Sequence, residues 1–230
     1  MRLVSFVSFK GGAGKTTALS ALCSALLARG QKVALLEGDE NAPLSRWRDN
    51  ARAAGTWDEA CEIHPSGDIA SFESATPRAE AAGVDIVLAD THGGGSELNV
   101  LIAASSQLVV VPSAMTSYDI DDSLATMGFL ADILEEDELD FIVALLLTRL
   151  PHTLNKSRQV EIDRLEVFPM FETKLRERDA LAGMKRTGML HLTLAARQAD
   201  PMGRISAKRF QMAMSEANRL ADDVLAALEE

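Results

Sequence analysis

The sequence of 230 residues contains only two cysteines, Cys23 and Cys61. Two cysteines are too few for a disulfide-built scaffold and have no metal-ligand spacing, so we expect two reduced structural thiols. The sequence also lacks an apolar run near the ~20 residues that a membrane-spanning helix needs. Its first residues, MRLVSFVSF, lack the small-residue cleavage site of a signal peptide. These absences predict a cytoplasmic protein.

Positive charge is also in short supply. The chain has 23 Lys and Arg against 34 Asp and Glu, a net charge of −11, which argues against indiscriminate binding to nucleic acid. The basic residues are unevenly distributed, because residues 145–211 hold 13 of them beside 7 acidic residues. Such asymmetry indicates one face suited to a polyanionic partner.

Strand-like and helix-like segments alternate along the chain. Strands are expected at residues 2–9, 32–39, 61–65, 84–90, 107–114 and 140–149. Helices are expected at residues 15–30, 43–55, 96–105, 119–136, 154–165 and 204–230, with a weak helix at 68–83 that Pro77 interrupts. Most of the strands are apolar throughout, which is typical of parallel strands buried on both faces. We therefore expect an α/β fold in which a single domain, residues 1–230, holds a mainly parallel sheet flanked by helices on both faces.

A glycine-rich segment, KGGAGKTT at residues 10–17, follows the first expected strand and opens the first expected helix. Strand, loop and helix in this order are the context that a phosphate-binding loop requires. The usual pattern, G-x-x-x-x-G-K-[ST], would place a glycine at position 9, but the sequence has Phe9 there and a second lysine, Lys10, after it. The segment predicts a phosphate loop whose first glycine is displaced by an added lysine.

The residues expected to contact ATP are Gly11, Gly12, Ala13, Gly14, Lys15, Thr16 and Thr17. The glycines allow backbone N–H groups to close around phosphate oxygens without clashes from Cβ atoms. Lys15 should reach the β- and γ-phosphates as a catalytic group, and the Thr16 hydroxyl should bind Mg²⁺. ATP and Mg²⁺ are therefore the expected cofactors.

Two of the expected strands end on aspartates that suit the same site. Asp90 lies at the carboxyl end of a buried parallel strand, where such sheets bind ligands, and is expected to support the metal. Asp39 is favoured as the catalytic residue that orients the attacking water, with a helix cap before residues 43–55 as the alternative. Glu37 lies at the end of the same strand, and only one of the two acids is expected to face the phosphates. His92 is expected to be a loop residue without a chemical role.

Eight basic side chains are candidates for contact with DNA: Lys174, Arg176, Arg178, Lys185, Arg186, Arg204, Lys208 and Arg209. Lys and Arg supply the phosphate contacts of non-specific binding, so the expected mode is backbone-directed and salt-dependent. The alternative is a solvated face on which Glu172, Glu177 and Asp179 partly pair these charges. Because the first strand begins near residue 2, we expect no helix-turn-helix module before it. The acidic stretch LADDVLAALEE argues against direct binding to anionic membranes.

Several of these segments together resemble the ParA/MinD family of deviant Walker A ATPases. The resemblance covers KGGAGKTT with Lys10, Asp39 after the second strand, VLADT with Asp90, and the later segments VVVPSAMTSYDID, LLLTRLP and LRERDALAGMKRTGMLHLTL. It implies a P-loop nucleotide-hydrolase fold and a place for Arg149, within LLLTRLP, beside the nucleobase. It also implies that Lys10 crosses to the partner's phosphates in an ATP-dependent homodimer, much as an arginine finger does. Members of the family hydrolyse ATP slowly until a partner protein stimulates them.

Within that family the sequence is most similar to the VirC-type ATPases of transfer-DNA processing, through VALLEGDENAPLSRWRDNA, LADTHGGGSELN and RERDALAGMKRTGMLHLTL. The resemblance implies a DNA-associated ATPase that promotes relaxosome assembly and is recruited to the nucleoid, a plasmid or the cell pole. A ParA-type partition ATPase is the alternative, and a MinD-like membrane-positioning ATPase or a small-molecule synthetase fits less well. One departure is Glu37, where the family usually has aspartate. The longer side chain shifts the carboxylate by ~1.5 Å, so the resemblance does not extend a magnesium role to position 37.

Overall fold

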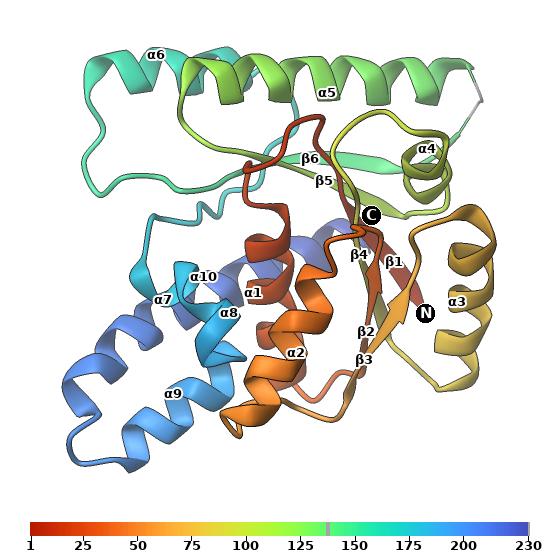
Figure 1. Cartoon of the computed structure of the whole chain (residues 1–230). Coiled ribbons are helices and arrows are strands. Elements are labelled where there is room, and N and C mark those ends of the chain that lie inside the picture. Colours follow the sequence, from red (N-terminus) through yellow and green to blue (C-terminus); the bar gives the residue numbers. More distant parts are fainter. Residues whose placement is uncertain (137–138, 230) are drawn as a thin grey trace.

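The computed structural model of the chain describes residues 1–136 and 139–229. Six strands within these ranges form one sheet in the order β3-β2-β4-β1-β5-β6, and every neighbouring pair is parallel. The strands are β1 (Arg2–Phe6), β2 (Val33–Glu37), β3 (Cys61–Pro65), β4 (Ile86–Asp90), β5 (Leu108–Ser113) and β6 (Ile142–Leu147). Each one falls within a strand expected from the sequence, so the parallel α/β prediction is confirmed (Figure 1).

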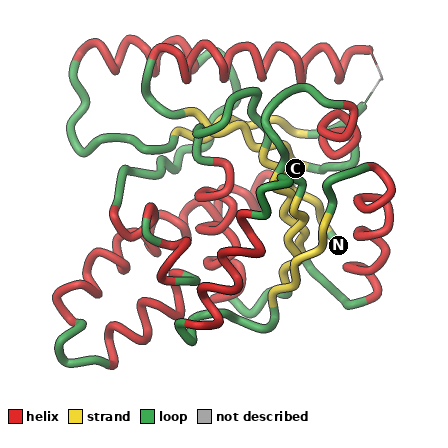
Figure 2. Tube along the Cα trace, in the orientation of Figure 1, coloured by secondary structure: helices red, strands yellow, loops and turns green. Residues whose placement is uncertain are grey.

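Helices cover both faces of the sheet (Figure 1, Figure 2). They are α1 (Lys15–Ala28), α2 (Pro43–Ala53), α3 (Ile69–Ala81), α4 (Glu97–Ala104), α5 (Ser117–Glu136), α6 (Lys156–Leu165), α7 (Asp179–Ala182), α8 (Met184–Thr187), α9 (Leu190–Ala199) and α10 (Arg204–Ala227). One core lies under α1, α2 and α7 to α10, and two smaller cores lie under α3 to α6. Because successive side chains of a strand point to opposite faces, Val4 and Phe6 of β1 enter the first core while Leu3 packs under α3. Cys23 and Cys61 are buried in the first core as free thiols.

Helix α3 corrects one expectation, because it continues through Pro77 instead of being interrupted there. Pro77 lies on the exposed side, so the carbonyl that loses a hydrogen bond to the missing N–H can turn to water. Phe72, Ala75 and Ala79 recur at helical spacing on the buried side and fasten the helix to the sheet. Burial of this stripe outweighs the cost of one proline.

Residues 179–199 contain three helices, α7 to α9, that the pattern of apolar residues did not predict. Two of them are single turns, and in α9 only Leu190 and Thr193 are fully buried. So few buried positions produce no clear helical period in the sequence. Among the described helices, none has the combination of length and apolar character needed to cross a membrane.

Parallel strands bring their carboxyl ends to one edge of the sheet, and that edge collects the loops of interest. The loops that follow β1, β2, β4 and β6 meet there, although they come from residues about 9, 39, 92 and 149 (Figure 1). Ligands of open parallel sheets bind at this edge.

Candidate nucleotide-binding site

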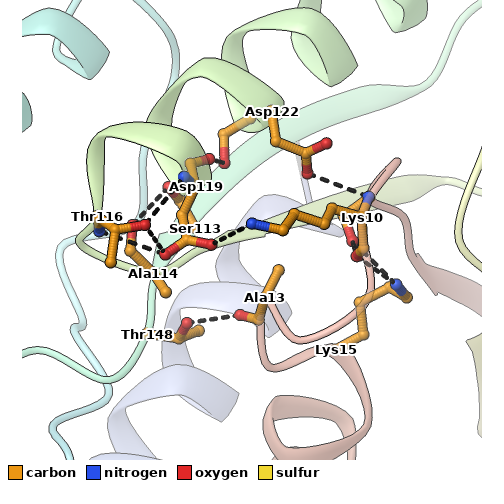
Figure 3. A network of polar contacts seen from close by, with 11 residues as sticks. Lys10, Ala13, Lys15, Ser113, Ala114, Thr116, Asp119, Asp122 and Thr148 are labelled. Carbon is orange, nitrogen blue, oxygen red and sulfur yellow. Dashed lines mark hydrogen bonds and ion pairs between the residues drawn. The ribbon is translucent and has the colours of Figure 1, made fainter.

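The phosphate loop joins β1 to α1 in a conformation that leaves its backbone N–H groups free for a ligand. Gly12 and Gly14 have φ angles of +98° and +96°, in the left-handed region that favours glycine. The Thr148 hydroxyl donates to the Ala13 carbonyl at 2.7 Å, which fastens the loop to the end of β6 (Figure 3). Gly14 is the cap of α1 and has no side chain to occupy the first N–H groups of the helix. An uncapped helix start of this kind is a ready anion site.

Lys15 extends into the hollow of this loop. Its Nζ donates to Ser8 Oγ at 2.9 Å and lies 3.4 Å from the Lys10 carbonyl oxygen, and only 9% of the residue is exposed (Figure 3). Burial lowers the pKa of Lys15, and nearby carboxylates, that of Asp90 foremost, oppose this shift. A buried ammonium with few anionic contacts is satisfied by a phosphate.

Thr16 and Asp90 form the second polar pair of the site. The Thr16 hydroxyl donates to Asp90 Oδ2 at 2.6 Å. The other oxygen, Oδ1, is buried and accepts no hydrogen bond from the described residues. Burial raises the pKa of Asp90 to about 6, against the Thr16 hydrogen bond and the Lys15 charge. The Thr16 hydroxyl and the carboxylate oxygen without a hydrogen bond are together a pair of oxygen ligands that fits Mg²⁺.

Asp39 lies across the same hollow, which has a volume of 470 Å³ and is also lined by the phosphate loop, Asn41 and His92. Asp39 Oδ1 accepts from the Asn41 N–H at 2.8 Å and from its side-chain amide at 3.0 Å. His92 Nδ1 is 4.0 Å from the same oxygen. The alternative role of Asp39 as the cap of α2 is wrong, because a different acid accepts the hydrogen bonds from the N–H groups in the first turn of α2.

Glu37 is that acid. Its Oε1 accepts from the N–H groups of Leu44 and Ser45 at 2.6 and 3.0 Å, and its Oε2 accepts from the Ser45 hydroxyl at 2.5 Å. The sequence favoured Asp39 over Glu37 for the phosphate side but gave no sign of this contact. A strand-end acid six residues before a helix that begins with proline is the signal that could have suggested it.

The Lys10 side chain points away from Lys15 and toward α5 (Figure 3). Its Nζ lies 3.7 Å from Asp119 Oδ1 and 5.8 Å from the centre of the Tyr118 ring, and its side chain is 52% exposed. The Lys10 N–H donates to Asp122 Oδ2 at 3.2 Å. The two lysines of the loop therefore face different surroundings, and of the two it is Lys15 that lines the hollow of its own chain.

Phe9, which replaces the first glycine of the usual pattern, anchors the loop to α5. Its ring packs against Phe129 with centroids 5.0 Å apart, and its N–H donates to Thr126 Oγ1 at 3.3 Å. This contact joins residues more than a hundred positions apart in the sequence, so no local pattern indicated it. It holds the start of the loop where Lys10 meets α5.

Arg149 stands at the junction of two hollows. It lines the phosphate hollow and also an adjoining cavity of 220 Å³, whose apolar wall includes Ala18, Leu175 and Leu181. Arg149 has a φ angle of +50°, which is uncommon for a residue with a side chain. An apolar slot opening from a phosphate site suits a nucleobase.

The structure separates the eight basic candidates. Arg178 forms a buried ion pair with Glu216 at 2.6 Å, and Arg176 donates from its guanidinium to the carbonyls of Pro151 and His152. Lys174 is partly buried. The remaining five are exposed and form two groups: Lys185 and Arg186 on α8, and Arg204, Lys208 and Arg209 on the first turns of α10. Of the acids expected to pair them, Asp179 lies 3.8 Å from Arg209, whereas Glu216 was not foreseen.

This parallel sheet, with the glycine-rich loop after its first strand, has the fold of the P-loop proteins of the ParA/MinD type. Solved structures of known proteins have a similar fold. A chain of the MinC:MinD cell division protein complex of Aquifex aeolicus superimposes with a TM-score of 0.66 at 16% identity, covering 96% of this chain and 95% of that one. The septum site-determining protein MinD from Pyrococcus horikoshii, complexed with Mg-ADP, gives a TM-score of 0.59 at 21% identity, covering 96% and 97%.

Comparison of the sequence with known proteins identifies the particular family. The VirC1 protein family model matches residues 1–230. Protein virC1 of Rhizobium rhizogenes is 44% identical over 230 residues, which is the full length of both chains. The chain belongs to the VirC1 family.

Proposed function

We propose that this protein is a Mg-ATP-dependent ATPase that dimerises on ATP, hydrolyses it slowly, and acts on DNA or nucleoprotein in plasmid or transfer-DNA processing and recruitment. The observation that carries the proposal is the phosphate loop with a buried Lys15 beside the Thr16–Asp90 pair, whose Oδ1 lacks a partner among the described residues. The Mg-ADP bound to MinD from Pyrococcus horikoshii, which has a similar fold, supports an adenine nucleotide with Mg²⁺ as the ligand.

Each side chain has a defined task in this proposal. Lys15 and the N–H groups of the loop bind the phosphates, and Thr16 and Asp90 hold Mg²⁺, which would neutralise charge that develops on phosphate oxygens. Asp39 orients the attacking water from the facing side of the hollow. Lys10, directed away from its own site, is available to the phosphates of a second subunit. The apolar slot beside Arg149 receives the nucleobase.

Replacing Asp39 by alanine should leave ATP binding and the ATP-dependent dimer intact while turnover falls by roughly 10²–10⁴-fold, the usual contribution of a positioned base. Phosphate release measures turnover, and a fluorescent ATP analogue and light scattering measure the other two properties. Glu40→Ala, an exposed acid in the same loop, is the matched control and should retain turnover. Loss of ATP binding in Asp39→Ala would instead assign Asp39 a structural task.

The DNA contact is proposed for the exposed basic groups. Residues 201–215 carry Arg204, Lys208 and Arg209 without a single acid, on a chain whose net charge is −11. Lys185 and Arg186 lie on α8, where the Lys185 carbonyl accepts from the Asn50 amide of α2. Arg176 and Arg178 already have partners within the fold, so they contribute least to this surface.

Reversing Lys185 and Arg186 to glutamate should weaken retention of duplex DNA and reduce the slope of log K against log salt by about 2, because two phosphate contacts are lost. Filter binding at several salt concentrations measures both quantities. Reversing Lys156 and Arg158, exposed on the distant α6, makes the same change in net charge and is the control (Figure 1). Equal losses in both variants would show that net charge alone governs retention.

A further inference from the structure

We infer that Glu37 is a positioning residue that sets Asp39 over the phosphate hollow by fixing the first turn of α2 to the end of β2. The inference rests on the proposed ATPase function. Glu37 is the last residue of β2, only 7% of it is exposed, and both of its carboxylate oxygens face α2. Asp39 lies two residues further on, in the short loop between these two elements.

The start of α2 depends on Glu37 for its caps. The capping position is Ala42, whose methyl group accepts no hydrogen bond, and the helix then opens on Pro43, which has no N–H. The next two N–H groups, those of Leu44 and Ser45, both donate to Glu37 Oε1. A carboxylate there also meets the positive end of the helix dipole. Because Glu37 takes this position, Asp39 is not drawn into capping and can face the hollow.

The loop that carries Asp39 is held at both ends. At its start the Gly38 N–H donates to the Asp90 carbonyl at 2.9 Å, and a Cβ atom on Gly38 would lie 2.8 Å from that oxygen. At its end the Ala42 N–H donates to the Asp39 carbonyl at 2.8 Å. Ala42 has a φ angle of +47°, which disfavours a residue with a side chain. A disfavoured backbone conformation persists only where the surrounding structure fixes it. The contacts of Glu37 with Leu44 and Ser45 begin two residues beyond Ala42.

The length of the side chain, not its charge, is what the geometry requires. Aspartate at position 37 would draw the carboxylate back by ~1.5 Å, out of hydrogen-bond range of Leu44 and Ser45. Glutamine has the same reach as glutamate. Its amide oxygen can accept from both N–H groups, and its amide nitrogen can donate to the Ser45 hydroxyl. Glu37→Gln should therefore preserve the loop, and Glu37→Asp should release it.

The test compares the kcat and KM of Mg-ATP hydrolysis in Glu37→Asp, Glu37→Gln and the exposed control Glu40→Asp. Glu37→Asp should lower kcat by roughly 10- to 100-fold, the effect of a shift of about 1 Å in a catalytic group. Its affinity for a fluorescent ATP analogue should stay within about threefold, because the phosphate loop is untouched. Glu37→Gln and Glu40→Asp should stay within about threefold of the parent in kcat. In an Asp39→Ala background, Glu37→Asp should cost no further turnover, since the group that it positions is gone.

Several outcomes would overturn the inference. Parental kcat in Glu37→Asp, even with a lowered melting temperature, would make Glu37 a cap with no link to turnover. Equal losses in Glu37→Asp and Glu37→Gln would show that the charge is what counts. If Glu37→Asp does not fold, Ser45→Ala removes a single contact and should still lower kcat with unchanged nucleotide affinity. Absence of hydrolysis by the parent protein would overturn the proposed function itself, which is a distinct result.

Discussion

Replacing Asp90 by asparagine should stabilise the nucleotide-free protein at pH 8 and at the same time weaken its Mg²⁺-dependent binding of ATP. Burial raises the pKa of this carboxyl from 3.8 to about 6. Keeping it ionised in the fold therefore costs on the order of 3 kcal/mol. Asparagine is neutral, and its amide oxygen can still accept the Thr16 hydroxyl.

The sign of the pH dependence follows from the raised pKa. At about pH 3, below both pKa values, the folded and the unfolded chain both carry mostly the protonated carboxyl, so parent and variant should be equally stable. As the pH rises toward 6 the unfolded chain ionises first, and the folded parent loses stability relative to the variant. The advantage of Asp90→Asn should reach its full value above pH 6 and stay constant to pH 8.

Urea unfolding of both proteins between about pH 3 and pH 8 measures this difference. Asp132→Asn, an exposed carboxylate on α5, should change stability by less than about 0.5 kcal/mol at every pH. Binding of a fluorescent ATP analogue with Mg²⁺ should fall at least about tenfold in Asp90→Asn, with little loss when Mg²⁺ is chelated. A variant that is less stable than the parent at pH 8 would contradict the prediction. It would mean that Thr16 and Lys15 stabilise the ionised carboxylate by more than its burial costs.

Much of this site was accessible from the sequence, because its parts lie at the ends of strongly apolar strands. Asp39 follows β2 and Asp90 ends β4, and parallel strands necessarily bring such ends together with the loop after β1. The glycines and Lys15 were recognisable from local spacing alone. Each of these inferences needs only the apolar pattern that marks the strands and the spacing of residues within the glycine-rich loop.

The remainder depends on contacts between distant parts of the chain. Phe9 meets Phe129, and Arg178 meets Glu216, through packing that no local period encodes. The task of Glu37 depends on the path of a loop that returns to the strand end, which alternation along β2 cannot describe. Helix α9 was missed for a different reason, because too few of its residues are buried to produce a helical period in the sequence.

Replacing Lys10 by alanine should weaken ATP-dependent dimerisation and lower turnover by about 10³-fold or more, as loss of an arginine finger does. The ATP affinity of the single chain should be retained, because the Lys10 side chain leaves its own hollow and rests beside Asp119. Lys15→Ala, by contrast, should lose nucleotide binding. Asp119→Asn removes the charge beside the half-exposed Lys10 side chain, and the amide oxygen can still accept from Thr116, so stability should change by less than about 1 kcal/mol and turnover should stay intact.

Mixing two inactive variants separates action across the dimer from action within one chain. In a mixed dimer of Lys10→Ala and Asp39→Ala, the site of the Lys10→Ala subunit keeps its own Asp39 and receives Lys10 from the other subunit. That site is complete only if Lys10 crosses the interface. An equal mixture should then recover up to about a quarter of the parental turnover, since half of the dimers are mixed and each has one complete site. If Lys10 served its own chain, neither site of the mixed dimer would be complete and the mixture would stay inactive.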